Sequence, residues 1–299
     1  MTISSNHVLS TKQEIRAPSS LRRLLRAIYR DRLAMMGILI VLVTLIVAFS
    51  ASWLAPYDPI EVNFSEKLLP PSPAHLLGTD ENGRDILSRC MFGIRISLEV
   101  AVVVLSVAVT LGIVLGGLAG FVGGRVDEVL MRITDMFLAF PALVLALAIS
   151  AALRPSLNNA MLAVAIVWWP WYARLVRAQT LSIKQLPYVE AARALGSGEI
   201  SIFVRHILPN CIAPVLVMAS LDVGFTILMT ASLSFVGLGA QSPTPELGAM
   251  IGRGRIYMLD QWWVPTFPGL VIFIMILGVN LMGDSVRDLL DPRFYRPPR

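Results

Sequence analysis

Few residues in this sequence have the type and spacing that covalent chemistry needs. The three histidines, His7, His75 and His206, are far apart, and so are the two cysteines, Cys90 and Cys211. No His-Glu-x-x-His segment, cysteine pair or Gly-x-Ser-x-Gly turn is present, which argues against a metal site or a catalytic triad. None of the lysines follows a glycine in the Gly-Lys-Ser/Thr pattern of a phosphate-binding loop. We therefore expect a non-catalytic chain with no cofactor and no metal.

Two acidic residues, Glu99 and Asp222, lie inside long apolar stretches of the sequence. A charge at the middle of a bilayer costs roughly 2.5–3.5 kcal/mol on insertion scales, so such residues usually face the interior of a helix bundle or an aqueous path. Both are therefore candidates for a substrate path. A structural role is the alternative: Asp222 would then bond to a neighbouring helix, and Glu99 would lie at the membrane interface.

One segment between the apolar stretches has the pattern of a protein-binding surface. In residues 186–196, a proline near the start and a glycine at the end predict a short helix from about Pro187 to Leu195. Ser197 is suited to cap a second helix, which Pro209 would end. Two short helices joined at Gly196 would form a compact protruding elbow. Four residues of the second helix share one apolar face at i, i+3, i+4 and i+7 spacing: Ile200, Phe203, Val204 and Ile207.

The elements that would position these residues are membrane helices. Of the 299 residues, 56% are hydrophobic and 15% are charged, against about 45–50% and about 25% in soluble proteins. This composition excludes intrinsic disorder, and two cysteines in so long a chain exclude a disulfide scaffold. A helix of about 20 apolar residues can cross a bilayer. We predict an all-α membrane protein with six such spans: Leu33–Tyr57, Val100–Val122, Met136–Leu153, Pro155–Ala173, Ile207–Pro245 and Tyr257–Gly283.

The basic residues indicate how the spans are oriented. With the N-terminus in the cytoplasm, most of the 25 lysines and arginines lie in cytoplasmic segments, as the positive-inside rule requires. Six spans then place both termini in the cytoplasm. The long charged segment before the first span favours a retained anchor over a cleaved signal peptide. Nucleic-acid binding is disfavoured, because the basic residues flank apolar runs instead of forming one stripe.

Three further patterns concern packing and the loops. The loop between the first two spans, residues 55–95, contains Pro70-Pro71-Ser72-Pro73 and is expected to be extended rather than folded. The tryptophans of residues 168–171 and 262–263 are interpreted as an aromatic belt at the membrane interfaces. Four glycines of the second span indicate close helix packing, either inside the chain or with a partner: Gly112, Gly116, Gly117 and Gly120.

The elbow segment resembles a known sequence motif. Glu190-Ala191-Ala192, followed by Gly196 and Leu208-Pro209, is similar to the EAA loop of bacterial ABC-importer permeases. In that family, a short coupling helix of this loop docks into a groove of the cytoplasmic ATPase subunit. His206 departs from the pattern, because the family usually has an aliphatic residue at that position. By this resemblance, the residues that couple the chain to an ATPase are Glu190, Ala191, Ala192, Gly196, Leu208 and Pro209.

Other segments resemble signatures of the dipeptide, oligopeptide and nickel C-type permeases. They lie at the end of the first span, in the outer loop, after the fifth span and at the C-terminus, so the resemblance covers nearly the whole chain from about Leu21. The matching segments are Ala55–Pro59, His75–Asp80 with Gly83–Asp85 and Ser88–Arg89, Ser234–Gln241 with Pro243–Glu246 and Gly248, and Asn280–Asp284 with Arg287–Asp288 and Leu290–Arg293.

The resemblance implies the architecture of an ABC type I importer permease. Residues 1–90 would form a cytoplasmic tail, the first membrane anchor and an outer loop, and residues 91–299 the core permease domain with a coupling loop at residues 182–209. The implied partners are a second, related permease subunit, two cytoplasmic ATP-binding subunits that hydrolyse the ATP, and an extracytoplasmic substrate-binding protein. The implied cargo is a dipeptide, an oligopeptide, a nickel chelate or glutathione, carried inward across the bacterial cytoplasmic (inner) membrane.

A stand-alone oligomeric secondary carrier or channel is the alternative function. It is less favoured, because the sequence has no inverted internal repeat and no chain of charged residues in its spans beyond Asp222 and Glu99. A purely structural membrane anchor would not need the elbow.

Overall fold

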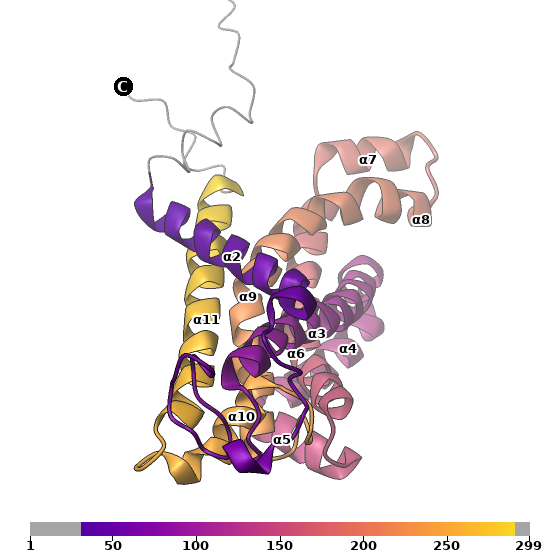
Figure 1. Cartoon of the computed structure of the whole chain (residues 1–299). Helices are drawn as coiled ribbons and strands as arrows, with labels where there is room; N and C mark the ends of the chain where they lie inside the picture. The colour runs from indigo at the N-terminus through magenta and orange to yellow at the C-terminus, as the bar shows by residue number, and fades with distance from the viewer. Residues whose placement is uncertain (1–30, 291–299) are drawn as a thin grey trace, which may run out of the picture.

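The chain is helical throughout the part that the structure describes, apart from its loops. The computed structural model describes the backbone of residues 31–290 and the side chains of residues 31–284; the basic N-terminal tail and the end of the C-terminal signature lie outside these residues. Within them, the only β-type contact is an isolated bridge between Thr79 and Asp85. The all-α prediction is therefore confirmed for the described residues (Figure 1).

The helical elements follow one another in this order along the described residues. They are α2 (Arg32–Leu54), η1 (Phe64–Glu66), α3 (Ile86–Val122), α4 (Gly124–Leu138), α5 (Ala142–Leu153), α6 (Leu157–Lys184), α7 (Pro187–Ala194), α8 (Glu199–Ile202), η2 (Phe203–Ile207), α9 (Leu208–Val236), α10 (Leu247–Gly254), η3 (Arg255–Tyr257) and α11 (Trp263–Leu290).

Local sequence signals explain where several helices begin and end. The side chain of Asp31 accepts hydrogen bonds from two backbone N–H groups in the first turn of α2. Asp85 and Ser156 cap α3 and α6 in the same way. α9 ends where Gly237 adopts the left-handed conformation, with φ 94°, which glycine reaches without steric cost.

Four helices are long and apolar enough to cross a membrane: α2, α3, the continuous helix from Glu199 to Val236, and α11. The pair α4 and α5 is a fifth candidate if it is counted as one bent span. α6 is 28 residues long but is less apolar, because it contains polar side chains that bond to neighbouring helices. The described residues thus hold four or five candidate spans by length and composition, and the predicted count of six is not confirmed.

The third predicted span, Met136–Leu153, is wrong as a single helix. α4 ends at Leu138, α5 begins at Ala142, and the two helices are bent by 91°. Pro141 lies at the break, as the N-cap residue of α5. Proline has no backbone N–H and disfavours the helical conformation in the residue before it, so it divides a run that is otherwise apolar.

The centre of the bundle is the contact between α3 and α6, where glycines of α3 lie directly against α6. A Cβ atom on Gly116 would collide with the backbone carbonyl of Ala173, and one on Gly112 would collide with Tyr172. A Cβ atom on Gly120 would lie 2.8 Å from Thr180 Cβ and 2.9 Å from the carbonyl oxygen of Arg177, both in α6. Small residues allow two helix backbones to approach closely. The glycine pattern therefore serves packing inside the chain, which decides between the two possibilities left open by the sequence.

Trp168 and Trp169 are buried in this contact region. Both lie near the middle of α6, which continues through Pro170, and Trp168 stacks on Phe225 of α9. Trp263 at the start of α11 is buried as well. The aromatic-belt prediction is therefore wrong for these three tryptophans, because packing between helices determines their position.

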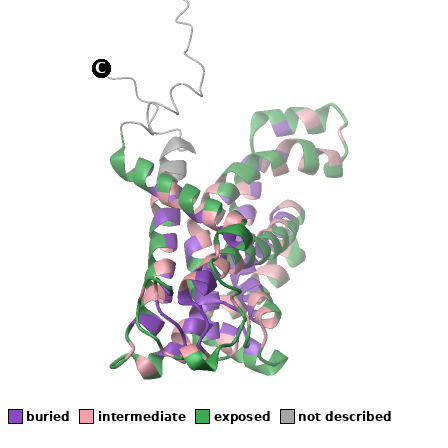
Figure 2. Cartoon of the chain, viewed as in Figure 1, coloured by how far each residue is buried: buried purple, intermediate pink, exposed green. Residues whose placement is uncertain are grey.

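The loop between α2 and α3, which we call the outer loop after its expected position, is folded, contrary to the expectation from its prolines. Its residues Thr79, Asp80 and Arg84 are buried, and Gly78 lies against Trp263 at the start of α11. The proline-rich segment at residues 70–73 stays largely on the surface of this fold. Figure 2 shows buried residues at this end of the molecule, where the loop meets the start of α3. The loop can be buried because its charged side chains are paired with one another.

Gly116→Ala is expected to lower the free energy of unfolding by about 1–3 kcal/mol, because the added methyl group would overlap the carbonyl of Ala173 and force α3 and α6 apart. Thermal unfolding of the purified chain in detergent measures the change.

Gly269→Ala is the matched control for this prediction. Its Cβ would lie 3.9 Å from Ile251 Cδ1, an ordinary contact distance, and alanine is favoured over glycine inside a helix by about 0.5–1 kcal/mol. A Gly116→Ala variant as stable as the Gly269→Ala variant would contradict the close-packing assignment.

Candidate functional site

Two short helices, α7 and α8, project from the bundle as an elbow at the end opposite to α10 and the outer loop (Figure 1). α7 spans Pro187–Ala194, in agreement with the prediction from its proline. After α7, Gly196 adopts a left-handed conformation with φ 83°. The N–H of Ser197 then donates to the carbonyl of Ala192, which closes the turn and sends the chain back toward the bundle.

The second helix of the elbow differs from the prediction in two ways. Its N-cap residue is Gly198 and not Ser197. Pro209 does not end the helix either, because α8 continues through a π-helical turn, η2, into α9. Pro209 therefore lies inside a continuous helix, directly after the π turn.

The π-helical turn also changes which side chains of the elbow face inward. Ile202 and Ile207, five residues apart, are buried, whereas Ile200 and Val204 are exposed. The predicted apolar face assumed α-helical spacing and is wrong for Ile200 and Val204. A π turn has i→i+5 hydrogen bonds, here from the N–H of Leu208 to the carbonyl of Phe203, so one extra residue shifts the face of the helix.

The inner face of the elbow is fixed to the end of α3. Val189 and Ile202 of the elbow are buried in one cluster with Phe121 at the end of α3. Lys184, the last residue of α6 before the elbow, donates from Nζ to the carbonyl oxygen of Phe121 at 2.6 Å and lies over the ring of that residue. Phe203 packs against Phe121 and against Gly117, where a side chain would collide with it. A positive charge at the carbonyl end of a helix is also stabilised by the helix dipole. Movement of the elbow would therefore be transmitted to α3.

An ion pair joins the two helices of the elbow. Arg193 Nε donates to Glu199 Oε1 at 2.9 Å, and this hydrogen bond raises the pKa of Arg193 above its usual value. Both side chains are exposed, so the pair contributes little to stability and mainly orients α8 relative to α7.

Several large apolar side chains of the elbow are exposed, beside the exposed charges of Glu190, Arg193 and Glu199. We call this exposed side the outer face of the elbow. Leu195 is 86% exposed and Ile200 is 81% exposed, and Tyr188 and Val204 are also exposed. Large apolar side chains gathered on a protruding element mark a surface for protein interaction. Of the predicted coupling residues, Glu190, Ala191, Gly196 and Pro209 are exposed, and Ala192 and Leu208 are half-buried.

Asp222 joins two helices inside the bundle. Its Oδ2 atom accepts hydrogen bonds from Trp168 Nε1 at 2.9 Å and from the Tyr172 hydroxyl at 2.7 Å, so α9 is tied to α6. Glu99 is exposed and accepts a hydrogen bond at 3.1 Å from Arg95, one turn earlier in α3. These contacts of Asp222 agree with the alternative in which it has a structural role and bonds to a neighbouring helix. Both acidic residues have hydrogen-bond partners within the chain.

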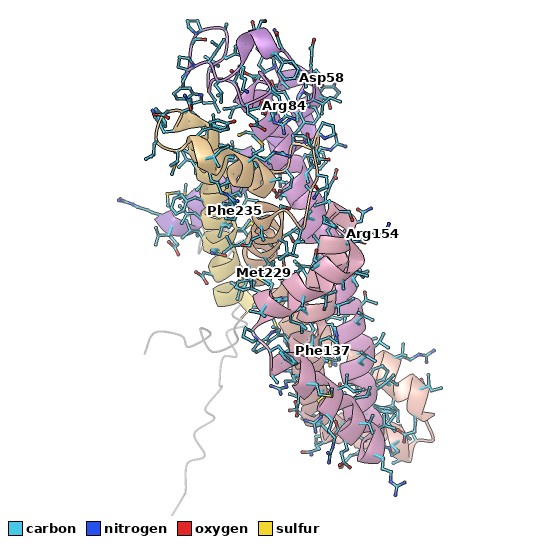
Figure 3. The ribbon with its side chains drawn as sticks, turned by 90° about the horizontal axis from the view of Figure 1, so that it is seen from below. Asp58, Arg84, Phe137, Arg154, Met229 and Phe235 are labelled. Carbon is cyan, nitrogen blue, oxygen red and sulfur yellow. The ribbon has the colours of Figure 1, made fainter. Side chains whose placement is uncertain are left out.

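A buried ionic cluster at the outer end was not recognised from the sequence. It consists of Asp80, Glu81, Arg84, Arg89 and Arg253. Arg84 Nε donates to Asp80 Oδ2 at 2.8 Å, and Arg89 Nε lies 3.4 Å from the same oxygen. Arg253 Nε lies 3.8 Å from Glu81 Oε1. The cluster therefore joins the outer loop, α3 and α10, and Figure 3 shows Arg84 at this end of the molecule.

Further buried acidic groups support the same end. Glu246 caps α10 by accepting from the N–H groups of Gly248 and Ala249; burial raises the pKa of its carboxyl, and these two bonds oppose the rise. Asp85 Oδ1 lies 3.0 Å from Nδ1 of His75. The sequence did contain a signal for this arrangement: charges of both signs at close spacing stand directly before an apolar span, where an unpaired charge would be unfavourable.

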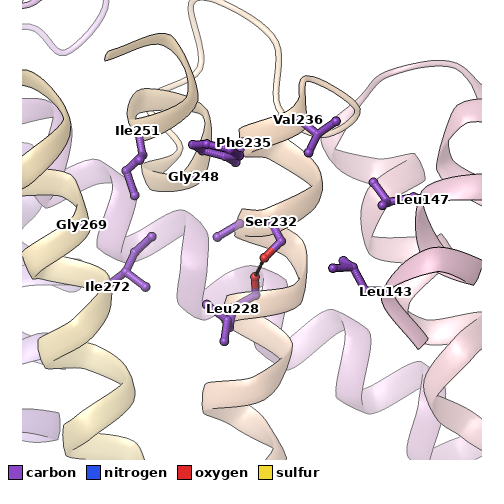
Figure 4. A pocket seen from close by; sticks show the side chains of 11 residues that line it. Leu143, Leu147, Leu228, Ser232, Phe235, Val236, Gly248, Ile251, Gly269 and Ile272 are labelled. Carbon is purple, nitrogen blue, oxygen red and sulfur yellow. Dashed lines mark hydrogen bonds between the residues drawn. The ribbon is translucent and has the colours of Figure 1, made fainter. Parts of the chain in front are cut away.

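An apolar hollow opens between α5, α9, α10 and α11 (Figure 4). Its volume is about 350 Å³, and its walls include Leu143 and Leu147 of α5 and Phe235 of α9. Ser232 is the one polar side chain among its lining residues, and its hydroxyl donates to the carbonyl of Leu228 at 2.7 Å. The hollow thus offers a mainly apolar surface with little capacity for hydrogen bonding.

Two family models match the sequence. The model of the binding-protein-dependent transport system inner membrane component matches residues 112–296. The model of the N-terminal transmembrane domain of oligopeptide transport permease C matches residues 19–71. The first match covers more than half of the chain and includes the elbow, and the second includes α2.

Three relatives illustrate the similarity. A probable D,D-dipeptide transport system permease protein of Escherichia coli (strain K12) is 50% identical over 257 residues, which are 86% of each chain. A glutathione transport system permease protein of Pectobacterium atrosepticum is 43% identical over 273 residues, 91% of each chain. A nickel transport system permease protein of Escherichia coli (strain K12) is 41% identical over 257 residues, 86% of this chain and 93% of the relative. The chain therefore belongs to the family of inner-membrane permease components of binding-protein-dependent ABC transport systems.

Proposed function

We propose that this chain is one permease half of an ATP-driven importer for short peptides. Separate subunits hydrolyse the ATP, and this chain forms half of the translocation pathway and receives their movement through its elbow. The observation that carries the proposal is the elbow itself, which has exposed apolar side chains on its outer face and an inner face packed against the end of α3.

The two faces of the elbow suit it to coupling. Burying one side chain such as Leu195 or Ile200 against a partner contributes about 1.5–3 kcal/mol, which is enough to hold a docking contact. On the inner side, Phe203 packs directly against Phe121 and Gly117 of α3, so a displacement of the elbow would be passed to the bundle. We therefore assign ATPase docking to the coupling loop at residues 182–209, with these residues at or beside the contact: Glu190, Ala191, Ala192, Gly196, Leu208 and Pro209.

The proposed topology has six spans: α2, α3, the bent pair α4 and α5, α6, the helix from α8 to α9, and α11. α6 is included because its charged side chains are paired with α4: Arg177 donates two hydrogen bonds to Asp127. α2 begins and α11 ends at the same end of the bundle as the elbow (Figure 1). A cytoplasmic elbow would thus place both termini in the cytoplasm.

The proposed cargo is a short peptide. Two of the three relatives described above are named for a dipeptide and for glutathione, which is itself a tripeptide, and the third for nickel. The peptide class is therefore preferred, and a nickel chelate is the second candidate.

The proposed assembly contains a second, related permease, two ATP-binding subunits and an extracytoplasmic substrate-binding protein. Closure of the ATPase dimer would move the elbow and switch the central path from inward-facing to outward-facing, so that cargo released by the binding protein can enter. The proposed division into residues 1–90 and 91–299 falls in the first turns of α3, which Asp85 caps.

A stand-alone carrier or channel remains the competing function. Such a protein would purify without ATP-binding subunits and would be driven by an ion gradient. The exposed apolar side chains of the elbow favour the importer, because a protein without cytoplasmic partners gains nothing from exposing Leu195 and Ile200 to water.

Leu195→Ser is expected to weaken binding of the ATP-binding subunit by at least tenfold, because the lost burial of about 1.5–3 kcal/mol exceeds the 1.4 kcal/mol that corresponds to a factor of ten. Titration of the purified subunit onto the permease in lipid nanodiscs measures the affinity. Leu259→Ser is the matched control, since Leu259 is 95% exposed in the loop before α11. An equal effect of both substitutions, or no effect of either, would refute the docking assignment.

Gly196→Asp is expected to abolish transport while the chain still inserts into the membrane. Nothing lies within 4 Å of a Cβ at this position, so the new carboxylate would disturb the docking surface and not the core. Gly237→Asp is the control, because Gly237 also has a positive φ and open space around it but ends α9 far from the elbow. Peptide uptake by cells and the amount of protein in membrane fractions separate the two effects. Normal uptake by Gly196→Asp would exclude this part of the elbow from coupling.

Asp222→Asn is expected to keep both stability and transport, because an amide oxygen can accept the same bonds from Trp168 and Tyr172. Asp222→Ala would leave two donors unpaired and lower the free energy of unfolding by about 1–3 kcal/mol. Thermal unfolding and uptake are measured on both variants. If Asp222→Asn is fully stable and does not transport, its charge serves the substrate path; Glu99→Gln tests the other candidate in the same way.

A further inference from the structure

A small cavity lies inside the ionic cluster at the outer end of the molecule. Its volume is about 10 Å³, the lower limit for one water-sized ligand, so a larger ion enters only if a side chain of the wall moves. The polar groups in its wall are the five side chains of the cluster, and apolar side chains of α3, α10 and α11 complete it. None of these residues belongs to the elbow or to the Asp222 contact.

Three guanidinium nitrogens of the cluster are buried and make no hydrogen bond to the described residues. They are Nε and Nη2 of Arg89 and Nη2 of Arg253. Arg89 Nε still lies 3.4 Å from Asp80 Oδ2 in an ion pair, so the Nη2 atoms of the two arginines are the donors without any partner. Arg89 is 0% exposed, so its free donors cannot be satisfied by bulk water. A buried donor without a partner is unfavourable, and more so when it is charged.

Arg89 is also held firmly in place. Its Nη1 atom donates to the carbonyl oxygens of Pro59 at 2.6 Å and of Pro243 at 3.4 Å. The guanidinium group is planar and rigid, so these two bonds fix the direction of the remaining donors. The unpaired nitrogens are thus held at the cavity by the outer loop and by the segment before α10.

The acidic side chains of the cluster are already engaged as acceptors. Asp80 Oδ2 accepts from Arg84 Nε, and Asp80 Oδ1 accepts from the N–H groups of Asn82 and Arg84. Glu81 Oε1 accepts from Arg84 Nη2. Glu246, the nearest further acid on α10, uses its two oxygens to cap that helix. The wall of the cavity therefore offers free donors in excess of free acceptors.

The charge of the wall favours an anion over a water molecule. Three arginines and two carboxylates line the cavity, so one negative charge would balance them. A water molecule would bring two hydrogens that need acceptors, whereas an anion needs only donors. Arg253 is the adjustable part of the wall, because its side chain is 30% exposed and can move to admit an ion and fit it.

We propose that this cavity binds one small monovalent anion of halide type, with chloride as the abundant representative. Arg89 and Arg253 donate to the ion, which thereby links α3 to α10 beneath the outer loop. The site stabilises the outer end of the permease and is independent of the coupling function proposed for the elbow.

Thermal unfolding of the full-length chain in detergent tests the proposal, with sodium chloride compared with sodium gluconate at equal ionic strength. Chloride is expected to raise the midpoint by about 2–4 °C at concentrations several times its dissociation constant and then to saturate. Gluconate is too large for the cavity and should have no effect. A midpoint that is the same in both salts overturns the proposal.

Arg253→Met removes one of the two donors and is expected to abolish the difference between the two salts. Arg255→Met is the matched control, because Arg255 is exposed two residues further along and does not line the cavity; this variant should keep the full chloride effect. An unchanged chloride effect in Arg253→Met, or its loss in Arg255→Met, contradicts the assignment.

Crystals of the unmodified permease grown in bromide give a direct measurement that needs no variant. An anomalous-scattering peak between Arg89 and Arg253 is expected. If no peak is found in this cavity, the proposal is overturned even if chloride stabilises the protein, because the stabilising ion would then bind elsewhere.

Discussion

The close approach of α3 to α6 is the contact on which most of the other interactions depend. Because Gly116 has no side chain, the backbone of α6 lies against α3 at a distance that no larger residue would allow. From that position α6 makes polar contacts in three directions. Trp168 and Tyr172 bond to α9, Arg177 bonds to α4, and Lys184 bonds to the end of α3 beneath the elbow. A shift of α6 by the width of a methyl group would disturb all of these contacts together, since packed interiors have no free volume to absorb it.

The two ends of the bundle are built from different chemistry. At the outer end, charges of both signs are buried together, so that the loop before α3 is joined to α10 without a disulfide or a sheet. At the elbow, several exposed side chains are apolar, and the ionic contact between Arg193 and Glu199 lies on the surface. Buried charge pairs impose a specific geometry, because a misplaced partner leaves an unpaired charge. Exposed apolar groups are instead stabilised by any complementary surface. The outer end is thus suited to a fixed shape, and the elbow to contact with another protein.

The sequence predicts the features that depend on neighbouring residues. The helix at Pro187–Ala194 follows from a proline and a glycine within ten residues of each other, and the spans follow from the length of apolar runs. The bend at Pro141 has an equally local cause, but the apolar residues on both sides of this proline have the pattern of one continuous span. The position of Trp168 could not be predicted, because its partner Asp222 is distant in sequence and tryptophan also fits the membrane interface. In the candidate site, a motif predicts the coupling residues, whereas the exposure of Ile200 differs from the α-helical pattern because of a π turn that no residue type announces.

That π turn fixes the direction in which the elbow points. α8, η2 and α9 form one continuous helix, and each residue of an α-helix rotates the chain by about 100° around the helix axis. Gain or loss of one residue within residues 203–207 would therefore rotate the elbow about the axis of α9 by about that angle and break the packing of Phe203 against α3. The geometry of the proposed assembly with cytoplasmic subunits would in this sense be set by the length of a single turn, separately from the chemistry of the side chains that make the contact.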